Sequence, residues 1–563
     1  MSYQAAAIQY DCRFMDKEYN LEQLAWLVRQ AVGQGAKLVV LPEMCATGYY
    51  FDSQEQVAQV AEPVPDGKTT QLFMALAREL DCYIVAGLPE QEGARFYNTA
   101  ILVGPDGFLG RHRKTHHYTP DSTWAKVGDL PPAVFDTPIG SIAIQICMDV
   151  SYPEAPRISR LQGAQILCVP MNWSEPSVPS SVWVTRAREN GMYVVAANRF
   201  GQEKGFPFSG GSAVIDPEGR VLDCLVEGDG IVMGTVDLSV SPDRSSFPRR
   251  RPELYSGLLL QRYPWYQSNY YQVFAHKPLP PGGRQRVAAR RICAGALEAD
   301  LEQMKRAIVQ AAQAEVSLLV LPELALGGVP GDAGQARALG QGRDSPLLRE
   351  LSDWAAGQGV SVILGFVLEE DGARYNAAAC LTADGQMYVY KKSHLTREEL
   401  LWARPGDQAG LCVDLPHARV GILLGDEALV PEVPRLLANY GCDVLAIPAA
   451  YERCCAPCPG GQNGEDPFFW HIARVRANEN NVYAVFSSQG EGSGVFGPDM
   501  FLDPRYETIC PGEELAVLDV DTDFILQDGQ THCSVNVARE KPMLATRHTV
   551  WYDPLLEQSE VDV

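Results

Sequence analysis

Cys147 is the residue whose type and setting first suggest chemistry. It ends the apolar run SIAIQIC, which predicts a buried strand, and Ser151-Tyr-Pro-Glu154 follows with the Ser-x-x-Glu pattern and early proline that open helices. A bend from strand to helix exposes a side chain at a sheet edge and leaves backbone N–H groups, including that of Met148, free to bind an oxyanion. Cys147 could therefore be a nucleophile. It needs a base and a positive charge beside it, because a cysteine in an apolar strand is usually a core residue.

The chain repeats itself, and the repeat contains this segment. KLVVLPEM near residue 44 matches SLLVLPEL near residue 324. Further pairs follow in the same order, among them FYNTAILVGPDG with RYNAAACLTADG and ICMDVSYPEAPR with LGDEALVPEVPR. The sequence therefore predicts two homologous domains, 1–275 and 287–563, joined by a Pro/Gly-rich linker at 276–286.

The spacing within the two copies agrees as well as the order. Glu43 and Lys114 are 71 positions apart and their counterparts Glu323 and Lys392 are 69 apart. Lys114 precedes Cys147 by 33 positions, and Lys392 precedes residue 425 by the same 33. Such agreement favours a duplicated domain over chance similarity.

Strands and helices alternate within each copy. Short apolar runs such as KLVVLP, YIVAGL, ILCVPM and MYVVAAN predict buried strands. Between them, LEQLAWLVRQAVGQG places Leu21, Leu24, Val28, Ala31 and Val32 on one face at helical spacing and ends in a glycine. The pattern favours a layered α/β fold.

A strand ending in LPE, a lysine in RKTH and a cysteine in ICMD followed by YPE resemble the nitrilase, or carbon-nitrogen hydrolase, superfamily. The resemblance covers almost the whole chain and implies two tandem αββα four-layer sandwich domains. It implies that Glu43 is the general base, that Lys114 stabilises the tetrahedral intermediate and that Cys147 is the nucleophile. Asp121 falls where members often carry a second glutamate, which implies a supporting role for a shorter carboxylate.

The chemistry of these residue types agrees with those roles. A thiolate that forms a thioester divides the hydrolysis of an unreactive amide into two easier steps. Glu43 would take the thiol proton, pass it to the leaving amine and then activate water. Lys114 would lower the pKa of Cys147 and, with the Met148 N–H, receive the oxyanion.

The second copy departs from the family at one decisive position, because Gly425 stands where the thiol should be. We expect this domain to be catalytically inactive and to have a structural or regulatory role. Glu323 and Lys392 are expected to remain as a buried ion pair, since removal of one partner would strand the other charge.

The sequence narrows the chemical class of the substrate. Asp149 in ICMD is closer to amidase and carbamoylase patterns than to those of true nitrilases, so an amide or carbamoyl substrate is favoured over a nitrile. Val150 and Ser151 stand where related carbamoylases often place an arginine, which predicts a substrate without a neighbouring carboxylate. The candidate pocket residues are aromatic or neutral and favour an uncharged or aromatic amide; they are Tyr49, Tyr152, Asn172 and Trp173. A nitrilase and a non-catalytic binding or scaffold protein remain the alternatives.

Composition indicates which classes of binding partner and which cellular compartment to expect. The net charge of −23 argues against nucleic acid and anionic membranes, and no apolar run approaches the roughly 20 residues that span a bilayer. The N-terminus lacks signal-peptide features, and the 15 scattered cysteines do not resemble a disulfide framework, so a cytoplasmic protein is expected.

No cofactor is expected. Gly67-Lys-Thr lacks the first glycine of a P-loop, and SGGSAVID lacks the Asp-Ser of an ATP-pyrophosphatase loop. A zinc site at the cysteines 454, 455 and 458 would need a second pair nearby, such as Cys442 or Cys510, and metal is not favoured. His116 and His117 are expected to be hydrogen-bonded loop residues.

The two halves are expected to pack as an intrachain pseudo-dimer, because family members usually dimerise through the helices after the nucleophile. Trp183 and Trp470 occupy comparable places in the two copies. Further homo-oligomerisation is left open.

Overall fold

The computed structural model divides the chain into two compact units, of which one contains residues 2–242 and the other most of the chain from 247 to 549. The described residues are 2–242, 247–261, 278–451, 468–490, 492–499, 502, 504–523, 525–527 and 534–559. Within them no helix is both long and apolar enough to cross a bilayer.

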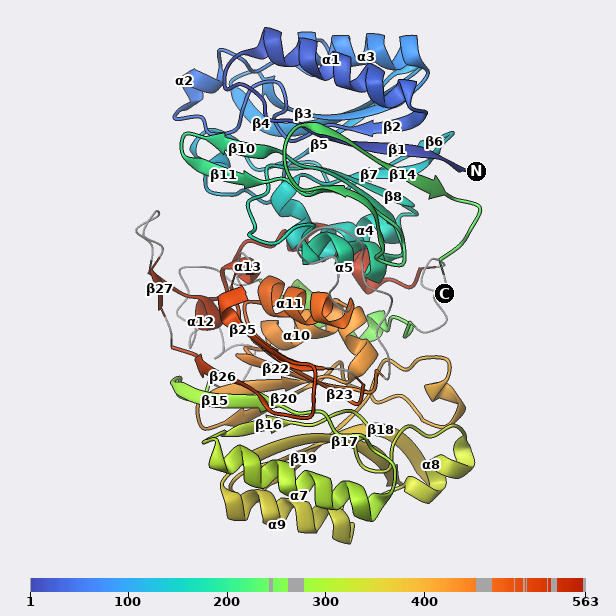
Figure 1. The fold of residues 1–563 in the computed structure, drawn as a ribbon, viewed down its shortest axis with the longest axis vertical. Helices are drawn as coiled ribbons and strands as arrows, with labels where there is room; N and C mark the ends of the chain where they lie inside the picture. Colours follow the sequence, from blue (N-terminus) through green and yellow to red (C-terminus); the bar gives the residue numbers. More distant parts are fainter. Residues whose placement is uncertain are drawn as a thin grey trace. The chain divides into compact units, whose positions relative to one another are not determined.

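The first unit has two six-stranded sheets packed face to face, with β1 against β9 and β12 (Figure 1). In spatial order the first sheet contains β14 (Gly230–Asp237), β1 (Ser2–Gln9), β2 (Ala36–Val40), β3 (Tyr83–Glu92), β4 (Arg95–Gly104) and β5 (Gly107–Arg113). The second contains β13 (Val221–Leu225), β12 (Ser212–Ile215), β9 (Tyr193–Ala197), β8 (Ile166–Pro170), β7 (Gly140–Ile144) and β6 (Val134–Thr137). A separate hairpin pairs β10 (Phe200–Glu203) with β11 (Phe206–Ser209).

Helices cover the outer face of each sheet, which completes the predicted αββα sandwich (Figure 1). On the first sheet lie α1 (Lys17–Gly33) and α3 (Lys68–Leu80), and on the second lie α4 (Glu154–Leu161) and α5 (Ser181–Asn190). The helical periodicity is confirmed for α1, whose Leu21, Leu24, Val28 and Ala31 are buried.

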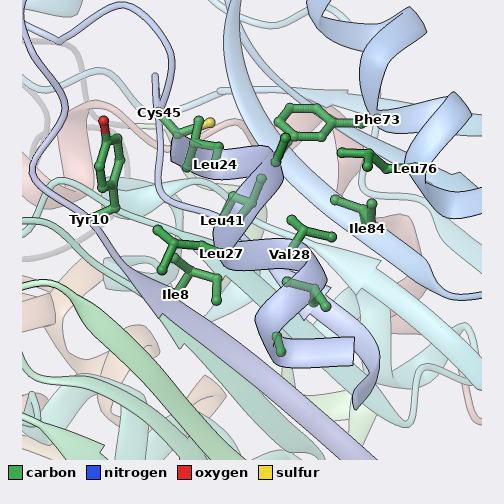
Figure 2. Packing of buried hydrophobic residues seen from close by; sticks show 14 of the residues in the cluster. Ile8, Tyr10, Leu24, Leu27, Val28, Leu41, Cys45, Phe73, Leu76 and Ile84 are labelled. Atoms are coloured by element: carbon green, nitrogen blue, oxygen red, sulfur yellow. The ribbon is translucent and has the colours of Figure 1, made fainter. Parts of the chain in front are cut away.

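The core between α1, α3 and the first sheet is apolar and closely packed. Leu24 and Val28 of α1 meet Phe73 of α3 above Ile84 of β3 and Leu41, which follows β2 (Figure 2). Burial of such side chains contributes about 1.5–3 kcal/mol each to folding. This core fixes the carboxyl end of β2, and the next residues of the chain are Pro42 and Glu43.

The second unit repeats this architecture. Its first sheet contains β19 (Met387–Lys391), β18 (Ala373–Leu381), β17 (Ser361–Glu370), β16 (Leu318–Val320), β15 (Arg284–Ala289) and β26 (Ala516–Asp521). Its second contains β20 (Leu411–Leu415), β21 (Ala418–Ile422), β22 (Val444–Ala449), β23 (Tyr483–Ser488), β24 (Ser493–Phe496) and β25 (Glu507–Cys510). The main helices are α7 (Leu297–Gln313), α9 (Pro346–Gln358), α10 (Glu432–Asn439) and α11 (Phe468–Asn480).

The segment 247–261 belongs to the second unit, although its sequence precedes residue 275. Arg250 Nε donates a 2.9 Å hydrogen bond to Glu432 Oε1, and both side chains are buried. Tyr255 Oη lies 2.8 Å from His394 Nε2. The structural division of the described chain thus falls between residues 242 and 247.

Candidate active site

Glu43, Lys114 and Cys147 follow the ends of three strands of the first unit. Glu43 lies in the turn after β2, Lys114 directly follows β5, and Cys147 begins a 3-10 turn, Cys147–Ser151, after β7. The expected helix start at Ser151 is wrong, because this 3-10 turn takes up the segment and α4 begins at Glu154 after Pro153.

Glu43 is buried and uses only one carboxylate oxygen. Its Oε1 accepts hydrogen bonds from Lys114 Nζ and Asn98 Nδ2, both at 2.7 Å. Its Oε2 is buried and has no hydrogen-bond partner among the described residues. Burial, with a contribution from the charge of Asp121, raises the pKa of Glu43 even though Lys114 opposes the shift. An unpartnered carboxylate oxygen with a raised pKa is suited to accept a proton.

Lys114 is held between two carboxylates. Its Nζ also donates to Asp121 Oδ2 at 2.7 Å, and the side chain is fully buried. Burial alone would lower the pKa of Lys114, but Asp121 and Glu43 outweigh burial and raise it well above its usual value. The ammonium group therefore keeps its charge. Asp121 occupies the place predicted for the supporting carboxylate despite its shorter side chain.

Cys147 is buried in a strained turn. Its φ of 45° lies in the left-handed region, which is uncommon for a residue other than glycine. Burial and then the charge of Glu43 raise the thiol pKa well above its usual value, while Lys114 and a hydrogen bond from the Asn172 backbone act in the opposite direction. Lys114 thus does not produce the lowered pKa that we expected for Cys147. Without substrate, the group is a thiol.

The backbone beside Cys147 offers a donor. The Met148 N–H donates no hydrogen bond to any described residue. A donor next to the thiol, together with the Lys114 ammonium group, has the chemistry needed to receive a negatively charged oxygen.

Two polar residues that were given no role in the sequence interpretation connect the site. Asp149 accepts from the backbone N–H groups of Ile146 at 3.0 Å and Thr115 at 3.0 Å, and so it ties the cysteine turn to the segment that carries Lys114. Its carboxylate also contacts His112 Nε2 at 2.9 Å. Asn98 donates to both Glu43 and Asp121, at 2.7 and 2.8 Å. Asn98 lies in the segment FYNTAILVGPDG, and the matching segment of the second copy repeats it as Asn376. That repetition could have indicated a role for Asn98.

The four predicted pocket residues are all buried, and two of them contact Glu43 or Asp121. Tyr49 Oη donates to Asp121 Oδ2 at 3.0 Å, and Asn172 Nδ2 donates to the Glu43 carbonyl at 3.0 Å. Tyr152 stacks on His116 with ring centroids 3.7 Å apart, and the backbone N–H of Trp173 donates to the Asn198 side chain. Tyr49 and Asn172 thus hold the triad segments, and their contact with substrate stays a prediction. His116 hydrogen-bonds Thr115 and Asp149, as expected of a loop residue.

The second unit preserves this network but not its nucleophile. Lys392 Nζ donates to Glu323 Oε1 at 2.8 Å and to Glu399 Oε1 at 2.6 Å, and Asn376 Nδ2 donates to both carboxylates at 2.7 Å. The expected buried ion pair is confirmed. Gly425 has a φ of 44°, close to that of Cys147.

Glu323 occupies the space above Gly425. A Cβ built on Gly425 would lie 2.2 Å from Glu323 Oε2, which is closer than any real Cβ contact. The second site has therefore lost more than a thiol, because the carboxylate now lies where the side chain of the nucleophile would begin.

The remaining sequence signals concern metal binding. Among the described residues no group of three His, Cys, Asp or Glu side chains could hold a metal ion. The cysteines at 454, 455 and 458 lie outside the described residues.

Comparison with known proteins agrees with the two-unit architecture. A family model described as carbon-nitrogen hydrolase matches residues 4–242 and again 286–523. A nitrilase from Pyrococcus abyssi is 38% identical over 222 residues, which are 39% of this chain and 84% of that protein. Omega-amidase NIT2 from Danio rerio is 32% identical over 263 residues, which are 43% of this chain and 92% of that protein.

Among solved structures, an amidase from Nesterenkonia sp. aligns with a TM-score of 0.38 and 29% identity, over 42% of this chain and 90% of that one. The family model covers most of the chain, and it does so in two matches that fall one in each half. The chain therefore belongs to the carbon-nitrogen hydrolase family, as a tandem two-domain hydrolase of carbon–nitrogen bonds in amides or nitriles.

Proposed function

We propose that the first unit hydrolyses a carboxamide through a thioester on Cys147, and that the second unit is not catalytic. The observation that carries the proposal is that the two oxygens of Glu43 differ: Oε1 is bound by Lys114, while Oε2 is buried and unpartnered among the described residues. The carboxylate acts electrostatically on the Cys147 thiol, whose pKa burial and then Glu43 raise well above its usual value. One oxygen is fixed and the other can take a proton.

The reaction follows from that arrangement. Cys147 Sγ attacks the amide carbon as its proton passes to Glu43 Oε2, and the carbonyl oxygen becomes an oxyanion near Lys114 Nζ and the Met148 N–H. Glu43 returns the proton to the nitrogen, the C–N bond breaks, and ammonia or an amine leaves a thioester. Water then attacks the thioester carbon while Glu43 accepts a water proton. Collapse of the second tetrahedral intermediate breaks the C–S bond and releases the acid, while Glu43 returns its proton to sulfur and so restores the Cys147 thiol.

Asp121 has a supporting role in this scheme. Its carboxylate keeps Lys114 charged and fixes the position of Nζ, and it is itself held by the Tyr49 hydroxyl and the Tyr118 N–H, each at 3.0 Å. A group held from several sides loses little further entropy when the transition state forms.

An amide is favoured over a nitrile on two grounds. Several relatives are named omega-amidases, one is named an (R)-stereoselective amidase, and others are named nitrilases. A nitrile carries no N–H, so it cannot donate a hydrogen bond to Glu43 Oε2 in the ground state, whereas a carboxamide can.

The test is ammonia release by the purified full chain from a panel of amides, N-carbamoyl compounds and nitriles, combined with intact-mass trapping of the acyl-enzyme. The parent should gain one acyl mass, localised to Cys147 by peptide mapping, and the Cys147→Ala variant should gain none. Turnover that survives in Cys147→Ala, or an acyl group at another residue, would overturn the mechanism.

A further inference from the structure

The two copies differ in the connection between the fourth and fifth strands, in chain order, of the second sheet. In the first unit, fourteen residues (198–211) separate β9 from β12 and include the β10–β11 hairpin. In the second unit, only four residues (489–492) separate β23 from β24. Four residues cannot form such a hairpin, so the copy without a nucleophile also lacks this element.

The hairpin is attached to the loop that follows Glu43. Glu203 at the end of β10 accepts hydrogen bonds from the backbone N–H groups of Tyr49 at 2.9 Å and Tyr50 at 2.5 Å. Arg199 holds the same carboxylate from the other side, with Nη1 2.5 Å from Glu203 Oε2. The hairpin and the loop therefore form one rigid wall.

Three half-buried aromatic rings lie on this wall. Tyr50 and Phe206 have ring centroids 4.8 Å apart, and Phe206 lies 6.3 Å from Tyr118. They rest on a buried apolar cluster that includes Phe208 and Trp124. We call Tyr50, Tyr118 and Phe206 the aromatic rim.

The rim lies near the nucleophile. The Tyr118 N–H donates to Asp121 Oδ2 at 3.0 Å, and the same oxygen accepts from Lys114 Nζ at 2.7 Å. Tyr50 directly follows Tyr49, whose hydroxyl donates to that oxygen at 3.0 Å. Burial raises the pKa of Tyr50, and Cys147 is among the groups that raise it further, in agreement with this placement. None of the four pocket residues predicted from the sequence belongs to the rim.

The second copy has replaced the rim together with the nucleophile. The positions that match Tyr50 and Tyr118 are Pro330 and Thr396, and the hairpin that would carry the third ring is missing. The match at Tyr118 is structural as well, because its N–H binds Asp121 as the Thr396 N–H binds Glu399. Rings needed only for packing would have no reason to disappear with the thiol, whereas rings that bind substrate would.

We propose that the aromatic rim receives the acyl group of the substrate and selects uncharged, flat or aromatic acyl groups; this inference rests on the proposed function of Cys147. Aromatic side chains bury a large apolar area and bind rings in offset or edge-to-face arrangements. The two cations of the hairpin are already paired, Arg199 with Asp11 and Glu203 and Lys204 with Asp52. An acyl group that carries its own carboxylate would therefore compete with existing ion pairs.

The first test compares turnover of phenylacetamide, acetamide and succinamic acid by the full chain. Phe206→Ala should lower kcat/KM for phenylacetamide at least about tenfold more than for acetamide, because contacts in an apolar pocket discriminate by about 10–200-fold per group. Phe206→Leu, which keeps apolar volume, should lose less. Trp26→Ala is the matched control, because Trp26 is a 57% exposed aromatic residue on α1, away from the rim.

Equal losses on all three amides, or a parent preference for succinamic acid, would overturn the proposal. A second measurement needs no turnover: calorimetric binding of intact phenylacetamide to the Cys147→Ala variant, with and without Phe206→Ala. The added substitution should weaken binding at least about tenfold, and unchanged binding would refute the rim even if a thioester forms. If the rim effect appears in binding but no acyl-enzyme is trapped in the parent, the proposed mechanism fails and the rim stands.

Discussion

Gly425→Ala tests whether the second site has been rebuilt around the absence of a nucleophile. The new Cβ would lie 2.2 Å from Glu323 Oε2, whereas ordinary contacts begin at 3.4 Å, so the carboxylate must move by more than 1 Å. That movement would disturb its bonds to Lys392 at 2.8 Å and Asn376 at 2.7 Å. Hydrogen bonds to charged groups contribute about 1.5–3 kcal/mol each. A non-glycine residue in the left-handed region costs a further ~1–2 kcal/mol.

The expected loss in the free energy of unfolding of the second unit is therefore about 2.5–5 kcal/mol, one charged bond plus the backbone cost. The assay is urea unfolding of the full chain. Gly372→Ala provides the control for the backbone cost alone, because Gly372 has a φ of 73° with nothing within 4 Å of a built Cβ. The control should lose only about 1–2 kcal/mol.

A double-mutant cycle separates the clash from other effects. Glu323→Ala removes the carboxylate that Gly425→Ala would displace, so the alanine at 425 should cost less in that background by about the energy assigned to the clash. If Gly425→Ala costs no more than Gly372→Ala, or if its cost is the same with and without Glu323, the reasoning is refuted.

Four further predictions concern the first unit and the whole chain. Cys147→Ala should reduce kcat by about five to six orders of magnitude in an ammonia-release assay while the far-UV circular dichroism spectrum is unchanged, since triad members act as a unit. Asp121→Asn should move the acid limb of the kcat/KM pH profile to lower pH, because loss of a neighbouring negative charge lowers the pKa of Glu43, whose deprotonated form is the base; an upward shift would contradict this. A slowly deacylating amide should label one site per chain by intact mass, including in Gly425→Cys, where Glu323 fills the position. The fragment 1–275 should aggregate, self-dimerise or lose activity in size-exclusion and turnover assays, because residues 247–261 pack within the second unit; a monomeric and fully active fragment would contradict the intrachain pseudo-dimer.

The internal repeat and the spacing of apolar residues predicted the fold because both can be read directly from the sequence. The helical spacing of Leu21, Leu24 and Val28 on α1 is a local property, and it survives into the structure because the apolar face has only one sheet to cover. The predicted helix start at Ser151 was wrong because contacts with residues distant in sequence determine the backbone there. The backbone there continues the 3-10 turn that Asp149 fixes through Ile146 and Thr115, and a capping pattern cannot reveal that competition.

The contact between Glu43 and Lys114 near Cys147 could be predicted from the sequence and the contact between the rim rings could not, because the two depend on different information. Glu43, Lys114 and Cys147 stand in ordered motifs that appear in both copies of the sequence. Tyr50 and Phe206 are 156 positions apart, and nothing in their local patterns indicates that β10–β11 brings the rings within 4.8 Å. The direction of a side chain is also not written in the local sequence. Tyr49 was predicted to line the substrate pocket, and its hydroxyl donates a hydrogen bond to Asp121.

The pattern of loss in the second unit separates what the fold requires from what catalysis requires. The charged network is retained: Lys392 donates to both Glu323 and Glu399, and Glu427 replaces Asp149 in accepting the Ser393 N–H at 3.0 Å. Removal of one member of a buried ion pair costs about 3–5 kcal/mol, so each charge preserves the others once the domain contributes to stability. No such coupling protects a thiol, a hairpin or an aromatic ring on the substrate side. Those are the features in which the two units differ, so the charged network alone does not distinguish the unit that carries the Cys147 thiol from the unit that carries Gly425.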